Sequence, residues 1–172
     1  MSVAVTSGEL EDRVGAFLSS AEVKSAAWAD AERWRSLSDG SGCPICTRGE
    51  PSDLIAEFAS TWVTAAREAP LPGYACVVSK MHVVEPFELS VQEQNQFWTE
   101  AMGVAQALTE FSGCVKMNYG IHGNVIPHLH LHLWPRLVDD PYDTGGIPAG
   151  VASFTRNDRY LARMAAALHQ AR

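Results

Sequence analysis

The chain of 172 residues carries 20 acidic against 13 basic side chains, giving a formal net charge of −7 and a sequence pI near 5.3. The acidic balance argues against a nucleic-acid partner, because Lys and Arg are not in surplus to displace the counterions of a polyanion. No apolar run reaches the roughly 20 residues that span a bilayer, so we expect no membrane partner either.

The first 40 residues read as a helical extension of one main domain, residues 41–172. Apolar residues recur at roughly helical spacing up to an Asp-Gly-Ser-Gly run at 39–42, which interrupts the pattern. Residues 1–11 lack a basic region followed by an apolar one, so we expect no secretory signal and a cytoplasmic location. The main domain is long enough, and apolar enough at 47% of the chain, to bury a sizeable core.

Cys43 and Cys46 follow this run directly. A Cys-x-x-Cys pair fits a redox site, but its surroundings lack the βαβ pattern typical of one. In a reducing compartment the thiols should be free or bind metal, and a closed zinc site would need two further ligands. The histidines nearest by motif position are His82, His122 and His128.

The middle and end of the chain alternate between strand and helix patterns. Short strands are expected at 54–59 and 61–65, a buried strand at 74–78 and another at 114–119, with Cys76 and Cys114 packed in the core. Ser90 and Glu93 form a capping-box pattern that opens the longest helix, to about residue 110. A last amphipathic helix is expected at about 156–170. This order predicts an α+β fold with an antiparallel sheet.

Residues 127–136 are the most informative stretch, because histidine and leucine alternate there. Strict alternation is typical of a half-buried strand, since successive side chains point to opposite faces. The leucines would face the core. The opposite face would carry three of the chain's six histidines: His128, His130 and His132.

Three interpretations of this histidine face are open. It can be a polar strand face that happens to use histidine. It can be a catalytic metal centre, although three imidazoles on one strand rarely all reach one ion. It can also be a site of covalent catalysis by a histidine nucleophile.

A nucleophilic imidazole needs one free ring nitrogen, while the other donates its N–H to a fixed acceptor. Phosphorus is a suitable electrophile, since neighbouring histidines can hold phosphoryl oxygens and protonate the departing group. Gly120 and Gly123, just before the strand, let backbone N–H groups approach phosphate closely. The pattern favours a small anionic ligand.

With these motifs together, the chain resembles the histidine-triad (HIT) family of nucleotide hydrolases and transferases. The resemblance covers about residues 43 to 146. In its combination of motifs, the chain is similar to a bacterial branch of the family described as diadenosine-polyphosphate-hydrolase-like. The motifs that carry it are at 128–133, 116–119, 123–124, 127, 135–136 and 139–141. The resemblance implies a five-stranded antiparallel sheet with a long helix, usually in a homodimer; the N-terminal extension and the last helix lie outside the match.

The resemblance implies a role for each histidine of the triad. His130 would be the nucleophile that forms a nucleotidyl-histidine intermediate, His132 would contact the phosphate or leaving group, and His128 would orient the site. The expected substrate-binding residues, besides His132, are Asn118, Gly123 and Asn124. The resemblance also implies a structural zinc ion and no organic cofactor. Its expected ligands are Cys43, Cys46, His82 and His128, and the alternative is two free thiols beside a hydrogen-bonded His82.

The expected reaction is hydrolysis of a dinucleoside-polyphosphate-like substrate with release of a nucleoside monophosphate. Transfer of the nucleotidyl group to another acceptor and phosphoramidate cleavage use the same intermediate and stay open, as does nucleotide binding without catalysis. Tyr74 stands where the family often has histidine, Asn124 where it often has glutamine and Val125 where it commonly has serine. The resemblance therefore predicts the chemistry but leaves the substrate open.

Overall fold

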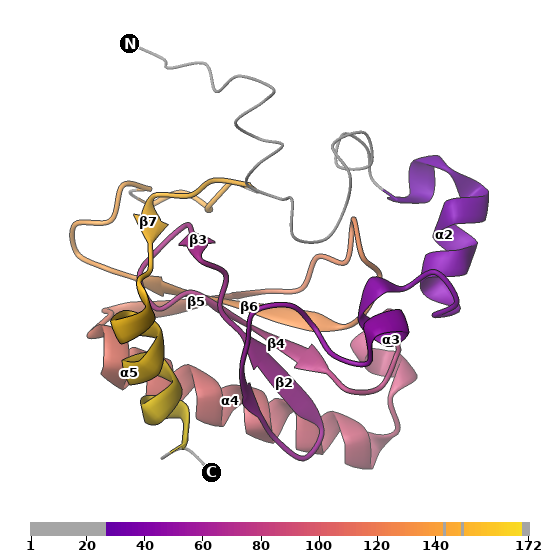
Figure 1. Ribbon diagram of the computed structural model, residues 1–172, viewed down its shortest axis with the longest axis horizontal. Helices are drawn as coiled ribbons and strands as arrows, with labels where there is room; N and C mark the ends of the chain where they lie inside the picture. The colour runs from indigo at the N-terminus through magenta and orange to yellow at the C-terminus, as the bar shows by residue number, and fades with distance from the viewer. Residues whose placement is uncertain (1–26, 143, 149, 170–172) are drawn as a thin grey trace.

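The fold is built on one five-stranded antiparallel sheet (Figure 1). The computed structural model describes residues 27–142, 144–148 and 150–169, so most of the predicted N-terminal extension, residues 1–26, lies outside the described residues. In spatial order the strands are β1 (Leu54–Glu57), β2 (Thr61–Thr64), β4 (Ala75–Ser79), β6 (His130–Arg136) and β5 (Lys116–Gly120). The α+β prediction and its antiparallel sheet are confirmed.

The long helix α4 (Val91–Ser112) covers one face of this sheet. Ser90 and Glu93 form the predicted capping box, in which each side chain binds the other residue's backbone N–H. Gly113 ends the helix in the left-handed region, at φ 67°. The C-terminal helix α5 (Asp158–His169) packs beside α4 (Figure 1). Both helices therefore lie close to their predicted positions.

The core lies between α4, α5 and the sheet. Leu129, Leu131 and Leu133 are buried there together with Phe97 and Leu108 of α4. Because side chains alternate along a strand, the histidines of β6 face away from α4. The helices thus leave the opposite face of β6 available for a site.

The remaining elements are short. They are the 3₁₀ helices η1 (Ala27–Ala29) and η2 (Pro86–Glu88), α2 (Ala31–Ser38), α3 (Pro44–Arg48), and the strands β3 (Glu68–Ala69) and β7 (Phe154–Thr155), which pair as a second small sheet. The Cys-x-x-Cys segment forms α3, with Cys43 at its N-cap, proline in its first turn and Gly49 in the left-handed region at its end.

The histidine strand is shorter than predicted. β6 begins at His130 rather than at residue 127, because the preceding segment forms only isolated backbone bonds, such as Leu129 N–H to the Val83 carbonyl at 2.7 Å. The predicted placement of His128 on the strand face with His130 is therefore wrong. His128 is 1% exposed and its ring turns toward the Cys43 segment.

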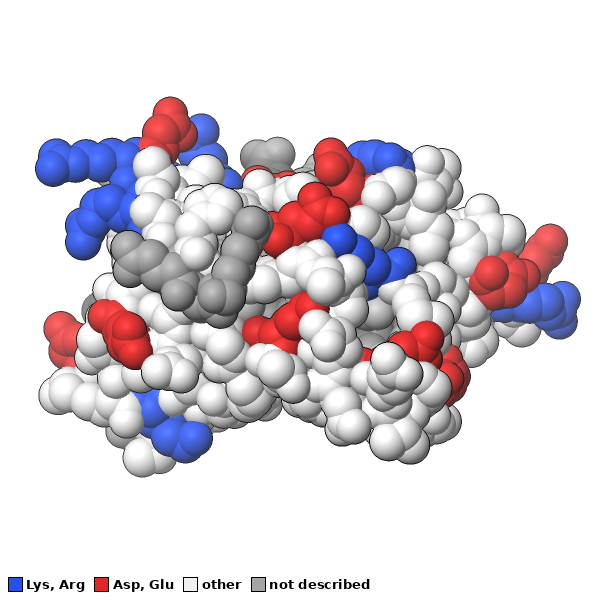
Figure 2. Space-filling view, turned by 90° about the horizontal axis from the view of Figure 1, so that it is seen from below, with Lys and Arg blue, Asp and Glu red and all other residues white. Residues whose placement is uncertain are grey.

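Charged side chains of both signs lie on the surface. On the face seen in Figure 2, acidic and basic side chains form small groups, several of them with both signs side by side, between broad uncharged areas. Within the described residues, no helix combines the length and apolar character required to cross a membrane.

Candidate functional site

The site is built around His130 and His132, adjacent on one face of β6. Their ring centroids are 4.8 Å apart with the rings nearly perpendicular. Burial lowers the pKa of His130 below the ordinary value of 6.5 and lowers that of His132 to about 3. Both imidazoles are therefore neutral at pH 7.

One hydrogen bond determines where His130 carries its proton. Its Nδ1 atom lies 2.6 Å from the carbonyl oxygen of His128. A carbonyl only accepts, so Nδ1 must carry the proton and Nε2 has the free lone pair. The contact of His128 with His130 is thus made by its backbone carbonyl, which fixes the orientation of the His130 ring.

His132 meets two side chains of the neighbouring strand segment. Its Nδ1 lies 2.7 Å from the Tyr74 hydroxyl and 3.1 Å from the Cys76 Sγ, while hydroxyl and thiol are 3.2 Å apart. Burial raises the pKa of Tyr74 well above 10 and that of Cys76 to about 11, so both groups keep their protons. If Tyr74 donates to Nδ1 and Cys76 donates to the phenol oxygen, every proton has an acceptor, and His132 keeps its own proton on Nε2.

The sequence prediction that Cys76 is a core residue is incomplete for this reason. Cys76 pairs with His132 across β4 and β6 and lies on the same face of the sheet. Cys114 does pack against the core, as predicted.

An aromatic group continues the site beyond His132. The Trp134 indole stacks on the His132 ring at 5.0 Å and 17°, and His122 contacts both rings edge-on, at 5.4 and 5.8 Å. Gly120 makes room for the indole, since a Cβ atom there would lie 2.8 Å from Trp134 Cζ3. Neither Trp134 nor this role of Gly120 was found from the sequence, because both depend on how β5 pairs with β6.

Asn118 is held next to Trp134 by Arg136. The Arg136 guanidinium forms a two-bonded ion pair with Asp140, at 2.7 and 3.0 Å, and donates to Asn118 Oδ1 at 3.1 Å. Arginine has only donors, so the amide oxygen of Asn118 must face Arg136, and its NH₂ group points elsewhere. This orientation leaves the NH₂ group of Asn118 available as a hydrogen-bond donor.

The other predicted phosphate residues lie in the loop between β5 and β6. Gly123 adopts φ 64°, which favours glycine, and Asn124 is exposed while its backbone carbonyl accepts the Ala27 N–H at 2.8 Å. Within the described chain, neither residue forms a hydrogen bond with a triad histidine.

The predicted metal ligands do come together. Their donor atoms all lie within 4.8 Å of one another; they belong to Cys43, Cys46, His82 and His128. The two Nδ1 atoms are 3.1 Å apart, and the three recorded S–N distances are 3.2, 3.5 and 3.8 Å. A tetrahedral zinc site with ordinary bond lengths has an N–N edge of about 3.3 Å and an S–N edge of about 3.6 Å.

Backbone carbonyls orient both histidines of this cluster. His82 Nε2 lies 2.9 Å from the Ser38 carbonyl and His128 Nε2 lies 2.8 Å from the Ser79 carbonyl. Each Nε2 therefore carries the proton, and two Nδ1 lone pairs face each other across 3.1 Å. Lone pairs at that distance repel unless a cation lies between them, so the four residues fit a metal ion. His122, the other candidate, is at the triad instead.

In the apo protein the thiols must lose protons before they bind metal. Burial and the adjacent Cys43 raise the pKa of Cys46 to about 11, and burial lowers the pKa of His128 to about 4. His128 is thus already neutral at pH 7, whereas metal binding at Cys46 displaces a proton.

The fold and site define an α+β protein with a half-buried histidine pair on one face of a sheet and a Cys/His cluster beside it. A sequence profile of the HIT domain matches residues 47–138, more than half of the chain, and the chain belongs to this family. The match begins after Cys43 and Cys46. Comparison with curated proteins finds no significant match.

Solved structures agree with this fold. A histidine triad protein from Bradyrhizobium japonicum is 24% identical with a TM-score of 0.62, over 68% of this chain and 87% of that one. A histidine triad protein from Marinobacter aquaeolei VT8 is 24% identical with a TM-score of 0.61, and the match covers 69% of this chain and 86% of that one. A Zn-bound histidine triad family protein from Mycobacterium smegmatis is 22% identical with a TM-score of 0.55, and the match covers 76% of this chain and 95% of that one.

Proposed function

We propose that this protein is a nucleotide hydrolase that cleaves a phosphoanhydride through a covalent nucleotidyl-histidine on His130. The observation that carries the proposal is the hydrogen bond from His130 Nδ1 to the His128 carbonyl, which leaves Nε2 free to attack phosphorus. Membership of the HIT domain family supports a nucleotide substrate.

The reaction has two steps. His130 Nε2 attacks the phosphorus next to the nucleoside, the bond to the bridging oxygen breaks, and the Nε2–H of His132 donates to that departing oxygen. Water then attacks the same phosphorus, the P–N bond breaks, and a nucleoside monophosphate leaves. The His128 carbonyl stabilises the positive charge that develops on the His130 ring, because it holds the Nδ1–H throughout.

A zinc ion at the Cys/His cluster is part of this proposal. Cys43, Cys46, His82 and His128 would hold it, and it would supply structural cross-linking rather than chemistry. The zinc-bound relative and the facing Nδ1 lone pairs support it. By holding His128 in place, such a site fixes the carbonyl that orients His130.

The homodimer and the cytoplasmic location also belong to the proposal. Support for a dimer comes from β5 at the sheet edge, where Tyr119 and the adjacent Val115 are 46% and 67% exposed. Support for a reducing location comes from the cysteines, all four of which are free.

The test is to trap the intermediate. A substrate labelled at the phosphorus next to the nucleoside is mixed with wild type and quenched in base, which preserves a phosphorus–nitrogen bond on histidine. We expect label on the wild-type chain and none on His130→Ala, with turnover reduced at least about 10³-fold in the variant. His169→Ala, on the exposed end of α5, is the matched control and should behave as wild type.

Full turnover by His130→Ala would disprove the assignment of His130 as the nucleophile. If label is trapped but phosphate or another acceptor is needed for release, the protein is a nucleotidyltransferase with the same intermediate. Binding of nucleotide with no turnover and no label would identify a non-catalytic nucleotide-binding protein.

A further inference from the structure

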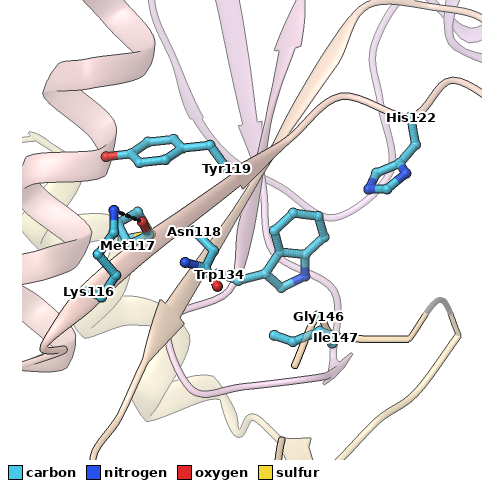
Figure 3. Close-up of a pocket in the computed structure, with 8 residues that line it drawn as sticks. All are labelled: Lys116, Met117, Asn118, Tyr119, His122, Trp134, Gly146 and Ile147. Atoms are coloured by element: carbon cyan, nitrogen blue, oxygen red, sulfur yellow. Dashed lines mark hydrogen bonds between the residues drawn. The ribbon is translucent and has the colours of Figure 1, made fainter. Parts of the chain in front are cut away.

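His122 lies outside the histidine strand, in the loop between β5 and β6, yet its ring lies beside the triad. The ring centroid is 5.4 Å from that of His132 and 5.8 Å from that of Trp134, and both rings are met edge-on. Figure 3 shows the imidazole beside the Trp134 indole, among the residues that line a pocket of about 360 Å³. Whereas His130 and His132 are half-buried, His122 is exposed.

Gly120 allows this close approach. In the pairing of β5 with β6, Gly120 is the partner of His132, so the space over Gly120 adjoins the His132 ring. A Cβ atom at Gly120 would lie 3.1 Å from Nε2 of His122, so this ring nitrogen lies where a side chain would otherwise be. Nδ1 of His132 meets Tyr74 on the β4 side of β6, whereas His122 lies on the β5 side. A group that His132 binds through Nε2 is therefore next to His122.

The two histidines of the strand lack a proton to release. Burial lowers the pKa of His132 to about 3 and that of His130 below 6.5, so both rings are neutral at pH 7. A neutral imidazole donates a hydrogen bond through its N–H but keeps that proton. His132 can thus hold the departing oxygen without protonating it. A leaving group that is unstable as an anion needs an acid from elsewhere.

His122 is placed to carry that proton. Because it is exposed, water can solvate a positive charge on its ring, which burial denies to His130 and His132. The charged or titratable groups around it are these two imidazoles and Lys116 of the same pocket. No acidic side chain is among the described residues that line this pocket. The phosphates of a bound substrate would therefore supply the negative charge that favours the protonated ring.

We propose that His122 is a further catalytic residue, the acid that protonates the departing oxygen and then the base that accepts a proton from water. The inference rests on the proposed function and adds a residue to its mechanism. As His130 Nε2 bonds to phosphorus, the P–O electron pair passes to the bridging oxygen, which takes a proton from the His122 imidazolium. When water attacks the phosphorus, the P–N electron pair returns to His130, and the proton that water loses restores the imidazolium.

The experiment compares two esters of adenosine 5′-monophosphate that transfer the same nucleotidyl group. The phenolate of the p-nitrophenyl ester leaves without a proton, whereas that of the phenyl ester is a poorer leaving group. His122→Gln should lower kcat/KM for the phenyl ester at least about 100-fold, a typical contribution of general acid catalysis, and change it less than about threefold for the p-nitrophenyl ester. Wild-type kcat/KM for the phenyl ester should fall as pH rises from 5 to 8, because the acid must be protonated, and the variant should lack this dependence.

Two further variants separate catalysis from packing. His122→Phe keeps an aromatic ring against His132 and Trp134 but has no ring nitrogen, so it should lose the phenyl ester as His122→Gln does. His169→Gln, on the exposed end of α5, is the matched control and should behave as wild type. An equal loss on both esters, or normal cleavage of the phenyl ester by His122→Phe, would mean that the ring only packs, and either result overturns the inference.

The charge of His122 is also measured without turnover. The imidazole ¹⁵N shifts of wild type with bound adenosine 5′-monophosphate should show an imidazolium that loses its proton between pH 5 and 8. A His122 ring that stays neutral over this range overturns the inference whatever the esters show. If wild type cleaves neither ester and traps no nucleotidyl label, the proposed function itself fails, and the role of His122 fails with it.

Discussion

Backbone carbonyls determine which ring nitrogen carries the proton in three histidines of this protein. The carbonyls of His128, Ser79 and Ser38 accept from His130, His128 and His82 in turn. Since a carbonyl cannot donate, each contact places the proton on one ring nitrogen and the lone pair on the other. His130 thereby exposes Nε2 to the site, whereas the other two turn Nδ1 toward the cysteines. His132 differs, because its Nδ1 meets a hydroxyl and a thiol.

Tyr74→Phe tests how His132 is oriented. The change removes the hydroxyl 2.7 Å from His132 Nδ1 and keeps the ring that stacks on His132. We expect kcat to fall about five- to tenfold with little change in KM, the effect of one lost hydrogen bond. Steady-state kinetics measure this, and the imidazole ¹⁵N shifts of His132 report the loss of the Nε2–H preference.

Tyr160→Phe, in α5 against Phe111, is the control and should leave kcat unaltered. Unchanged kcat and ¹⁵N shifts in Tyr74→Phe would show that the phenol does not position His132.

At the scale of elements, Glu100 ties the turn between β1 and β2 to α4. This carboxylate is 9% exposed and accepts from the Ser60 N–H, the Ser60 hydroxyl and the Thr61 hydroxyl, at 3.1, 2.9 and 2.7 Å. Burial opposes its ionisation, but the hydrogen bonds from Gln96, Thr61 and Ser60 outweigh burial, so the pKa of Glu100 lies below 4.5. The charged form therefore stabilises the folded state.

Glu100→Gln should lower the free energy of unfolding at pH 7 by about 1–3 kcal/mol, because an amide accepts these bonds less well. Since the folded pKa is below the unfolded one, the wild-type advantage is complete above about pH 4.5 and is lost as pH falls through the folded value. Urea unfolding at pH 7 and at pH 3 measures both effects. Glu110→Gln, exposed on the same helix, should change stability by less than about 0.5 kcal/mol. A difference that does not shrink at pH 3 would contradict this account.

At the scale of the whole molecule, the Cys/His cluster joins segments far apart in the sequence. Cys43 and Cys46 come from α3, His82 follows β4 and His128 precedes β6. Ser38, at the end of α2, orients His82, so the described part of the N-terminal extension is connected to this cluster as well. These four residues thus connect the periphery of the fold with the strand that carries His130.

Metal removal should therefore destabilise the whole domain. We expect one zinc per chain by elemental analysis, and chelation to lower the thermal midpoint by about 5–10 °C. Because zinc binding displaces a proton from Cys46, the pKa of which is raised to about 11, zinc affinity should fall as pH falls. Cys46→Ala should lose the zinc and Cys114→Ala should keep it. An unchanged thermal midpoint after complete metal removal would contradict a structural role.

Local patterns in the sequence determined much of this protein. The capping box and Gly113 set the limits of α4, and alternation placed the leucines and the His130–His132 pair on opposite faces of one strand, because each of these signals acts within a few residues. The four metal-ligand candidates came from the family resemblance, and the structure brings them together.

Only the tertiary structure decided what surrounds the histidines. Cys76 and Tyr74 meet His132 because β4 pairs with β6 in one register, and Trp134 covers Gly120 because β5 pairs on the other side of β6. The ring of His128 leaves the strand face for the cysteines, since α3 and the segment after β4 converge there. These contacts join residues many positions apart, and a one-residue shift in strand pairing would change all of them.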